Sequence, residues 1–208
     1  MTGPPMIDEG YIKFNSQLHQ TPPPSEWVVE EVNLWRDRMY ALGYIGAYEG
    51  EIGYGNISVK SDLLDDEFIV TGSGTGNIPI LFANHFTRVS SYSIDANSVV
   101  CEGRIDASSE SMTHAAVYAC APDARAVIHI HSGRHWVSLL DKIPTTSKSA
   151  AYGTPEMARE IKRLFDETDF REIRVMVMAG HDEGILSYGT NLDQAGRRLL
   201  DVLDGRYP

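Results

Sequence analysis

Three histidines in the sequence have a spacing that suits a divalent metal ion. His129 and His131 are two positions apart in the apolar segment 126–131, which is typical of a buried strand. Alternate side chains of a strand point to the same face, so both imidazoles should project together. As an isolated pair they are explained equally well by a metal site and by histidines that are hydrogen-bonded in the core or exposed on the surface. His181 follows a second apolar segment, 175–178, and three neutral imidazoles with an open fourth position are typical of a catalytic zinc site.

A carboxylate and two serines stand at the predicted start of a helix over 110–120. We predict Ser108 or Ser109 as the N-cap, with Glu110 in the first turn. Unpaired N–H groups gather at a helix start, and they suit an anionic group such as a phosphate. Taken alone, Glu110 is better explained as a first-turn carboxylate that the helix dipole favours.

The glycine-rich segment 71–76 is a second candidate for binding an anion. It has neither the Gly-Lys-Ser/Thr ending of a P-loop nor a clearly following helix. Its backbone N–H groups and hydroxyls can nevertheless surround a phosphate.

Composition restricts the possible partners. The chain has 208 residues, of which 42% are hydrophobic and 23% charged, typical of one globular domain. The net charge of -11 argues against nucleic-acid binding, which needs clustered lysine and arginine. An anionic substrate would have to be held locally, by backbone N–H groups or by a metal.

The sequence also indicates a cytoplasmic location. No apolar run approaches the roughly 20 residues that span a bilayer, so we expect no membrane segment. Residues 1–9 lack the basic and apolar regions of a signal peptide. Cys101 and Cys120 do not form a disulfide framework, which is consistent with reduced thiols.

Residues 1–24 are predicted to be an extended N-terminal arm, because prolines at 4–5 and 22–24 disfavour helices and central strands. The arm should pack on the body or on a neighbouring subunit. Residues 25–208 are predicted to form a single domain, with an antiparallel meander between 45 and 100. Helices are expected at 25–42, 110–120, 132–140, 155–167 and 192–203, and further strands at 126–131, 175–178 and 184–188.

The order of these motifs resembles the class II aldolase/adducin-like family from about residue 28 to residue 203. The shared pieces are 55–59 (Gly-Asn-Ile-Ser-Val), 71–74 (Thr-Gly-Ser-Gly), 108–114, 129–132 and 180–181. The resemblance implies an α/β fold with three α/β/α layers around a mainly antiparallel sheet. It also implies a zinc ion and a homotetramer whose active sites lie between subunits.

The resemblance further assigns roles to individual residues. His129, His131 and His181 would hold the zinc ion. Glu110 would be the catalytic acid/base and a possible fourth ligand. The positions that would hold the substrate phosphate are Asn56, Ser73, Gly74, Ser108 and Ser109. The implied reaction cleaves a small ketose 1-phosphate to dihydroxyacetone phosphate and an aldehyde, through an enediolate that the metal stabilises.

The sequence departs from the family pattern in ways that leave the substrate open. Relatives that cleave sugar phosphates carry a tyrosine shortly after an Ile-Pro pair, whereas Ile143 and Pro144 precede no tyrosine at that place. Tyr152 is offset from it, and Tyr207 is the tyrosine of the C-terminal tail. The alternatives are a ketose-phosphate 4-epimerase, a sugar-phosphate dehydratase or a decarboxylase on the same metal site. A further alternative is a non-catalytic scaffold that resembles the adducin head.

The remaining polar residues near these motifs receive supporting or surface roles. His114 lies one helical turn after Glu110 and is interpreted as supporting the site or packing. His135 is expected near the site and His85 on the surface. Glu183 and its neighbour at 182 are interpreted as solvent-facing turn carboxylates, with orientation of His181 as the alternative.

Overall fold

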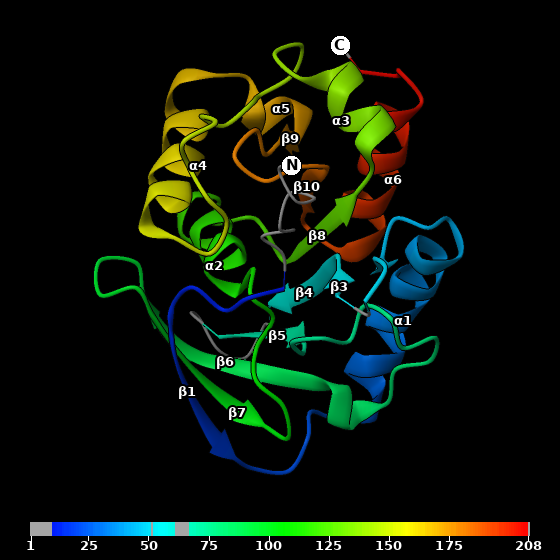
Figure 1. The fold of residues 1–208 in the computed structure, drawn as a ribbon, viewed down its shortest axis with the longest axis vertical. Coiled ribbons are helices and arrows are strands. Elements are labelled where there is room, and N and C mark those ends of the chain that lie inside the picture. The colour runs from blue at the N-terminus through cyan, green and yellow to red at the C-terminus, as the bar shows by residue number, and fades with distance from the viewer. Residues whose placement is uncertain (1–9, 51, 61–66, 208) are drawn as a thin grey trace, which may run out of the picture.

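The computed structural model describes residues 10–50, 52–60 and 67–207 of the chain. Its centre is an eight-stranded sheet in the order β1-β7-β6-β5-β4-β8-β10-β9 (Figure 1). The strands are β1 (Asn15–Gln20), β4 (Asn56–Lys60), β5 (Phe68–Thr71), β6 (Phe86–Ser93), β7 (Ser98–Gly103), β8 (Ala126–His131), β9 (Val175–Val177) and β10 (Gly184–Gly189). A small hairpin, β2 (Gly46–Ala47) with β3 (Gly53–Tyr54), stands apart from the sheet.

The expected three-layer α/β/α architecture is confirmed. Helices α2 (Ser111–Cys120), α4 (Pro155–Glu167) and α5 (Phe170–Ile173) cover one face of the sheet, and α1 (Glu26–Ala41) and α6 (Leu192–Leu203) cover the other (Figure 1). The shorter helices α3 (Gly133–Leu139) and η1 (Ala83–His85) lie in connections. Two separate apolar cores follow from this layering. Neighbouring residues of a buried strand therefore enter opposite cores, as Val127 and Ile128 do.

The sheet is mixed rather than purely antiparallel. Strands β4 to β7 form the expected antiparallel meander, and β8 pairs antiparallel with both β4 and β10. The exception is β1, which pairs parallel with β7. This strand, 15–20, lies within the segment predicted to be an extended arm, and the first nine residues of that arm are outside the described residues. Strand β1 is mostly exposed at the sheet edge, so it has no alternating pattern to reveal it.

The predicted N-caps of α4 and α6 agree with the structure, whereas that of α2 does not. Thr154 and Asn191 cap α4 and α6 through their side chains, as expected. The prediction that Ser108 or Ser109 caps α2 is wrong, because Glu110 occupies the N-cap position and its side chain makes no capping hydrogen bond. The carboxylate of Glu110 points instead toward the imidazoles of His129 and His181. Among the described residues, no helix is long and apolar enough to span a membrane.

Candidate metal centre

Strand β8 presents two imidazoles on the sheet face that α2 covers. His129 and His131 alternate with Ile128 and Ile130, which enter the core on the opposite face. The Nε2 atoms of the two histidines lie 3.0 Å apart, and both side chains are buried. The predicted placement of both rings on one strand face is therefore correct.

The third imidazole comes from the turn that joins β9 to β10. Strand β10 pairs with β8 so that Gly184 lies opposite His131, which brings the turn beside the two strand histidines. His181 Nε2 lies 3.1 Å from His131 Nε2. A Cβ at position 184 would lie 2.7 Å from His181 Cδ2 and 3.2 Å from His129 Cε1, so glycine is needed there.

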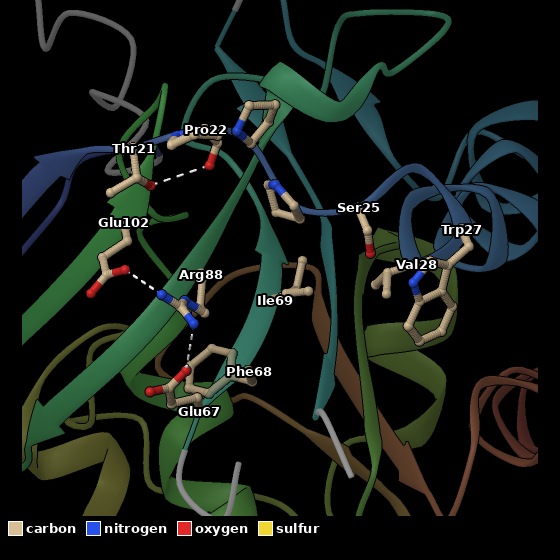
Figure 2. A pocket seen from close by; sticks show the side chains of 12 residues that line it. Thr21, Pro22, Ser25, Trp27, Val28, Glu67, Phe68, Ile69, Arg88 and Glu102 are labelled. Carbon is tan, nitrogen blue, oxygen red and sulfur yellow. Dashed lines mark hydrogen bonds and ion pairs between the residues drawn. The ribbon is translucent and has the colours of Figure 1, made fainter. Parts of the chain in front are cut away.

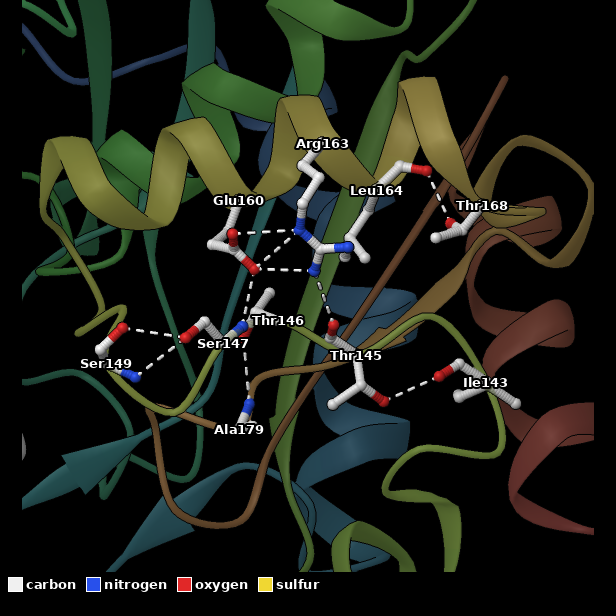
Figure 3. Close-up of polar contacts among 10 residues, drawn as sticks. All are labelled: Ile143, Thr145, Thr146, Ser147, Ser149, Glu160, Arg163, Leu164, Thr168 and Ala179. Carbon is white, nitrogen blue, oxygen red and sulfur yellow. Dashed lines mark hydrogen bonds and ion pairs between the residues drawn. The ribbon is translucent and has the colours of Figure 1, made fainter.

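The loop 143–150 holds the turn that carries His181 (Figure 3). Thr146 Oγ1 accepts a hydrogen bond from the N–H of Ala179 at 3.0 Å. Arg163 of α4 donates to a carbonyl of the same loop at 3.1 Å. The contact is close, since a Cβ on Gly180 would lie 2.1 Å from a backbone oxygen of the loop. The turn of the predicted ligand is thus placed by packing against a loop that α4 holds, not by its strand alone.

The carboxylate of Glu110 lies beside two of the three imidazoles. Its Oε1 atom lies 3.1 Å from His181 Nε2 and 4.0 Å from His129 Nε2. Both carboxylate oxygens are buried, and neither has a hydrogen-bond partner among the described residues. Burial raises the pKa of Glu110 to about 7. A buried carboxylate without hydrogen bonds is costly, and a cation beside it would offset that cost.

The donor set fits a divalent metal ion. The ligand atoms of His129, His131 and His181 lie within 4.8 Å of one another. Around one tetrahedral zinc ion, imidazole nitrogens at about 2.0 Å from the metal stand about 3.3 Å apart, close to the 3.0 and 3.1 Å found here. Burial lowers the pKa of all three imidazoles, that of His129 to about 3, so they are neutral ligands. These residues can therefore hold a metal, and the unsatisfied carboxylate of Glu110 lies beside them.

Two tyrosines and a carboxylate surround His131. The Tyr48 hydroxyl lies 2.8 Å from His131 Nδ1 and donates to Glu183 Oε2 at 2.8 Å. The ring of Tyr54 stacks on His131 with centroids 5.3 Å apart. The interpretation of Glu183 as a solvent-facing carboxylate is wrong, because the turn directs its side chain inward to Tyr48.

On the other side of the cluster, the start of the described chain lies against His181 through Tyr152. The rings of Tyr152 and His181 have centroids 4.5 Å apart. The backbone N–H of Tyr11 donates to the Tyr152 hydroxyl at 3.2 Å, and Lys13 Nζ lies 3.8 Å from the Tyr152 ring centroid. The segment before β1 therefore forms part of the wall of the candidate site.

A small glycine-lined hollow adjoins the metal cluster. Four of the five residues expected to hold phosphate line it, namely Asn56, Gly74, Ser108 and Ser109. The fifth, Ser73, does not line it, and its backbone N–H donates to Asp106. In the strand pairing Asn56 lies opposite His129, which fixes the hollow next to the histidines. Asn56 Oδ1 is buried without a hydrogen-bond partner among the described residues.

A buried arginine holds the glycine-rich loop of this hollow. Arg36 of α1 is 1% exposed and donates to the carbonyls of Thr75, Gly76, Ile78 and Pro79. Burial lowers the pKa of Arg36, and the four carbonyls solvate its guanidinium in place of water. The loop conformation therefore depends on a residue far away in the sequence.

A larger hollow lies elsewhere on the molecule, beside the start of α1 (Figure 2). Its lining includes Trp27, Phe68 and the ion pairs of Arg88 with Glu67 and Glu102. Both carboxylates neutralise the arginine, and no metal-binding group of histidines lines the hollow. We assign it no chemistry.

Comparison with known proteins agrees with the fold. The sequence model described as the class II aldolase and adducin N-terminal domain matches residues 49–202. The chain belongs to this family. The comparison with curated protein sequences finds no match.

Solved structures show the same fold at low sequence identity. An L-fuculose 1-phosphate aldolase matches with a TM-score of 0.65 and 23% identity, over 86% of this chain and 83% of its own. YgbL of Escherichia coli, described as a putative aldolase/epimerase/decarboxylase, matches with a TM-score of 0.62 and 18% identity, over 86% of each chain. A sugar-phosphate aldolase of Thermotoga maritima matches with a TM-score of 0.62 and 13% identity, over 86% of this chain and 91% of its own. At these identities the likeness concerns the fold.

The other histidines of this family member take supporting or peripheral places. His114 is fully buried, and its Nδ1 lies 2.7 Å from the Ser58 hydroxyl. His135 contacts the Ser132 hydroxyl at 2.8 Å, and His85 lies in η1. None of them belongs to the group of histidines whose ligand atoms converge.

Proposed function

We propose that the chain is a metal-dependent lyase that cleaves a small ketose 1-phosphate into dihydroxyacetone phosphate and an aldehyde. The observation that carries this proposal is the convergence of the His129, His131 and His181 imidazoles on one another. The orphaned carboxylate of Glu110 lies beside two of them. Membership of the class II aldolase and adducin family and the names of the similar structures support the reaction class.

The metal in this proposal is zinc, held by the three histidines. When bound, it would supply positive charge next to the substrate carbonyl. This charge would stabilise the electron pair that C3–C4 cleavage leaves on C3. Neutral imidazoles preserve that charge, whereas three anionic ligands would cancel it. The burial of the site removes water and strengthens this electrostatic effect.

Glu110 moves the proton in this mechanism. In the cleavage direction the C4 hydroxyl gives its proton to solvent as C4 becomes the aldehyde, and the Glu110 carboxyl group gives a proton to C3, which loses its bond to C4. In the reverse direction the Glu110 carboxylate removes the proton from C3. Burial raises the pKa of Glu110 toward neutral pH, which suits a group that both gives and removes a proton. Its position beside His181, one of the proposed zinc ligands, supports this role.

The glycine-lined hollow is proposed to bind the substrate phosphate. Its position opposite His129 suits a phosphate on the carbon next to the carbonyl that the metal polarises. Asn56, Ser108 and Ser109 bring polar side chains to the hollow, and Gly74 leaves the backbone open to an anion. Ser73, also proposed for this role, would act from the edge of the hollow.

We further propose a homotetramer with active sites between subunits, acting in the cytoplasm. Large apolar side chains that are exposed support self-association. They are Trp27 and Leu34 on α1, and Ile80 and Phe82 just after the segment that Arg36 holds. Light scattering of the purified protein measures the assembly mass directly.

A panel of ketose 1-phosphates tests the proposed reaction. We expect zinc-loaded protein to release dihydroxyacetone phosphate from at least one member, measured by coupled reduction of that product. Epimerisation of a ketose 5-phosphate, or loss of water or carbon dioxide from a related sugar acid phosphate, would replace the lyase proposal by the corresponding alternative. Metal binding without any turnover would favour the scaffold.

A further inference from the structure

Tyr48 and Glu183 form a short chain of hydrogen bonds that ends on a candidate metal ligand. The Tyr48 hydroxyl is 2.8 Å from both His131 Nδ1 and Glu183 Oε2. The hydroxyl carries only one proton, and the carboxylate can only accept it. The hydrogen bond to Tyr48 therefore has to be donated by His131 Nδ1–H.

This direction of the hydrogen bonds decides the tautomer of His131. With its proton on Nδ1, the imidazole presents a lone pair at Nε2, the atom that faces the other two histidines. Partners of this kind orient metal-binding histidines and raise the basicity of the ligand nitrogen. A carboxylate at the end of the chain strengthens both hydrogen bonds.

The backbone holds the Glu183 carboxylate in place at an energetic cost. Glu183 has a φ of 67°, a conformation that residues other than glycine rarely adopt. Its carbonyl accepts a hydrogen bond from the N–H of Ser132 at 2.9 Å, just after β8. A Cβ on Gly133 would lie 2.8 Å from Glu183 Oε1, so the absence of a side chain there leaves room for the carboxylate.

The hairpin β2–β3 carries Tyr48 over the site. The N–H of Tyr48 donates to the carbonyl of Ile52 at 3.0 Å, which closes the hairpin. The ring of Tyr48 packs on that of Tyr54 with centroids 4.7 Å apart, and Tyr54 in turn stacks on His131. The hydroxyl is thus positioned by the hairpin and by the packing of the two tyrosine rings.

We propose that Tyr48 and Glu183 are positioning residues that hold His131 in its metal-binding tautomer and orientation. This inference rests on the metal site of the proposed function. It extends that site to a tyrosine and a carboxylate that act on the metal only through His131.

Metal affinity of the isolated protein tests this inference without an activity assay. We expect Tyr48→Phe to weaken Zn²⁺ binding about 10- to 100-fold, measured by competition with a chromophoric chelator. The absorption spectrum of the Co²⁺-loaded protein should change as well, because the His131 ring is no longer fixed. Tyr54→Phe is the matched control, since its hydroxyl donates to the Gly43 carbonyl and not to His131. It should bind Zn²⁺ within twofold of the unaltered protein.

A second substitution tests whether the two residues act as one unit. Glu183→Gln removes the charge but keeps an acceptor, so its loss of affinity should be smaller than that of Tyr48→Phe. The double variant should bind no more weakly than Tyr48→Phe alone, because effects within one chain of contacts are not additive. Circular dichroism of the metal-free variants confirms that each is folded.

The outcomes separate this inference from the proposed function. Unchanged Zn²⁺ affinity in Tyr48→Phe, or an equal loss in Tyr54→Phe, would overturn the positioning role while leaving the metal site intact. Failure of the unaltered protein to bind Zn²⁺ would overturn the proposed function itself.

Discussion

Replacing Glu110 with glutamine should lower the rate of cleavage about 10²- to 10⁴-fold, the usual contribution of a positioned acid or base. The amide has nearly the shape of the carboxyl group but cannot exchange a proton at neutral pH. The steady-state rate on the best ketose 1-phosphate of the panel measures the effect. Because three histidines remain, we expect the variant to keep most of its bound metal.

Glu156→Gln is the matched control for this substitution. Glu156 lies at the start of another helix, in the first turn of α4, but it is exposed and pairs with Arg159. Its replacement should leave the rate unchanged. A Glu110→Gln protein that retains metal and the normal rate would remove Glu110 from the proposed mechanism.

Binding of Zn²⁺ should raise the melting temperature of the unaltered protein and not that of His131→Ala. A ligand at 100 times its dissociation constant stabilises the folded state by about 2.7 kcal/mol. For a chain of this size each kcal/mol corresponds to about 2–4 °C, so we expect a rise of about 5–11 °C. Scanning calorimetry with and without Zn²⁺ measures it.

His135→Ala is the control, because this histidine contacts Ser132 and Tyr44 and not the ligand cluster. It should show the same metal-induced rise as the unaltered protein. An equal rise in His131→Ala would mean that Zn²⁺ stabilises the protein from another site.

The features that sequence analysis predicted correctly depend on local patterns. The period of two in β8 places His129 and His131 on one face whatever surrounds the strand. The caps Thr154 and Asn191 act within a single helical turn. In each case the physical cause lies within a few residues of the feature.

The features that it missed depend on contacts between distant segments. Tyr48 reaches His131 and Glu183 across the fold, and Arg36 holds a loop about forty positions away. Neither has a local pattern that marks it. The N-cap of α2 was predicted incorrectly for a different reason. A local rule favours serine there, but Glu110 occupies the position and its side chain turns toward the histidines. Such departures from local rules are expected at functional sites.

The metal content of the purified protein tests the central claim most directly. Protein prepared without added metal, and analysed by mass spectrometry of the elements, should contain about one zinc ion per chain. The same preparation of His131→Ala should contain much less. Metal-free protein, or the same metal content in both preparations, would contradict the assignment of His129, His131 and His181 as the metal site.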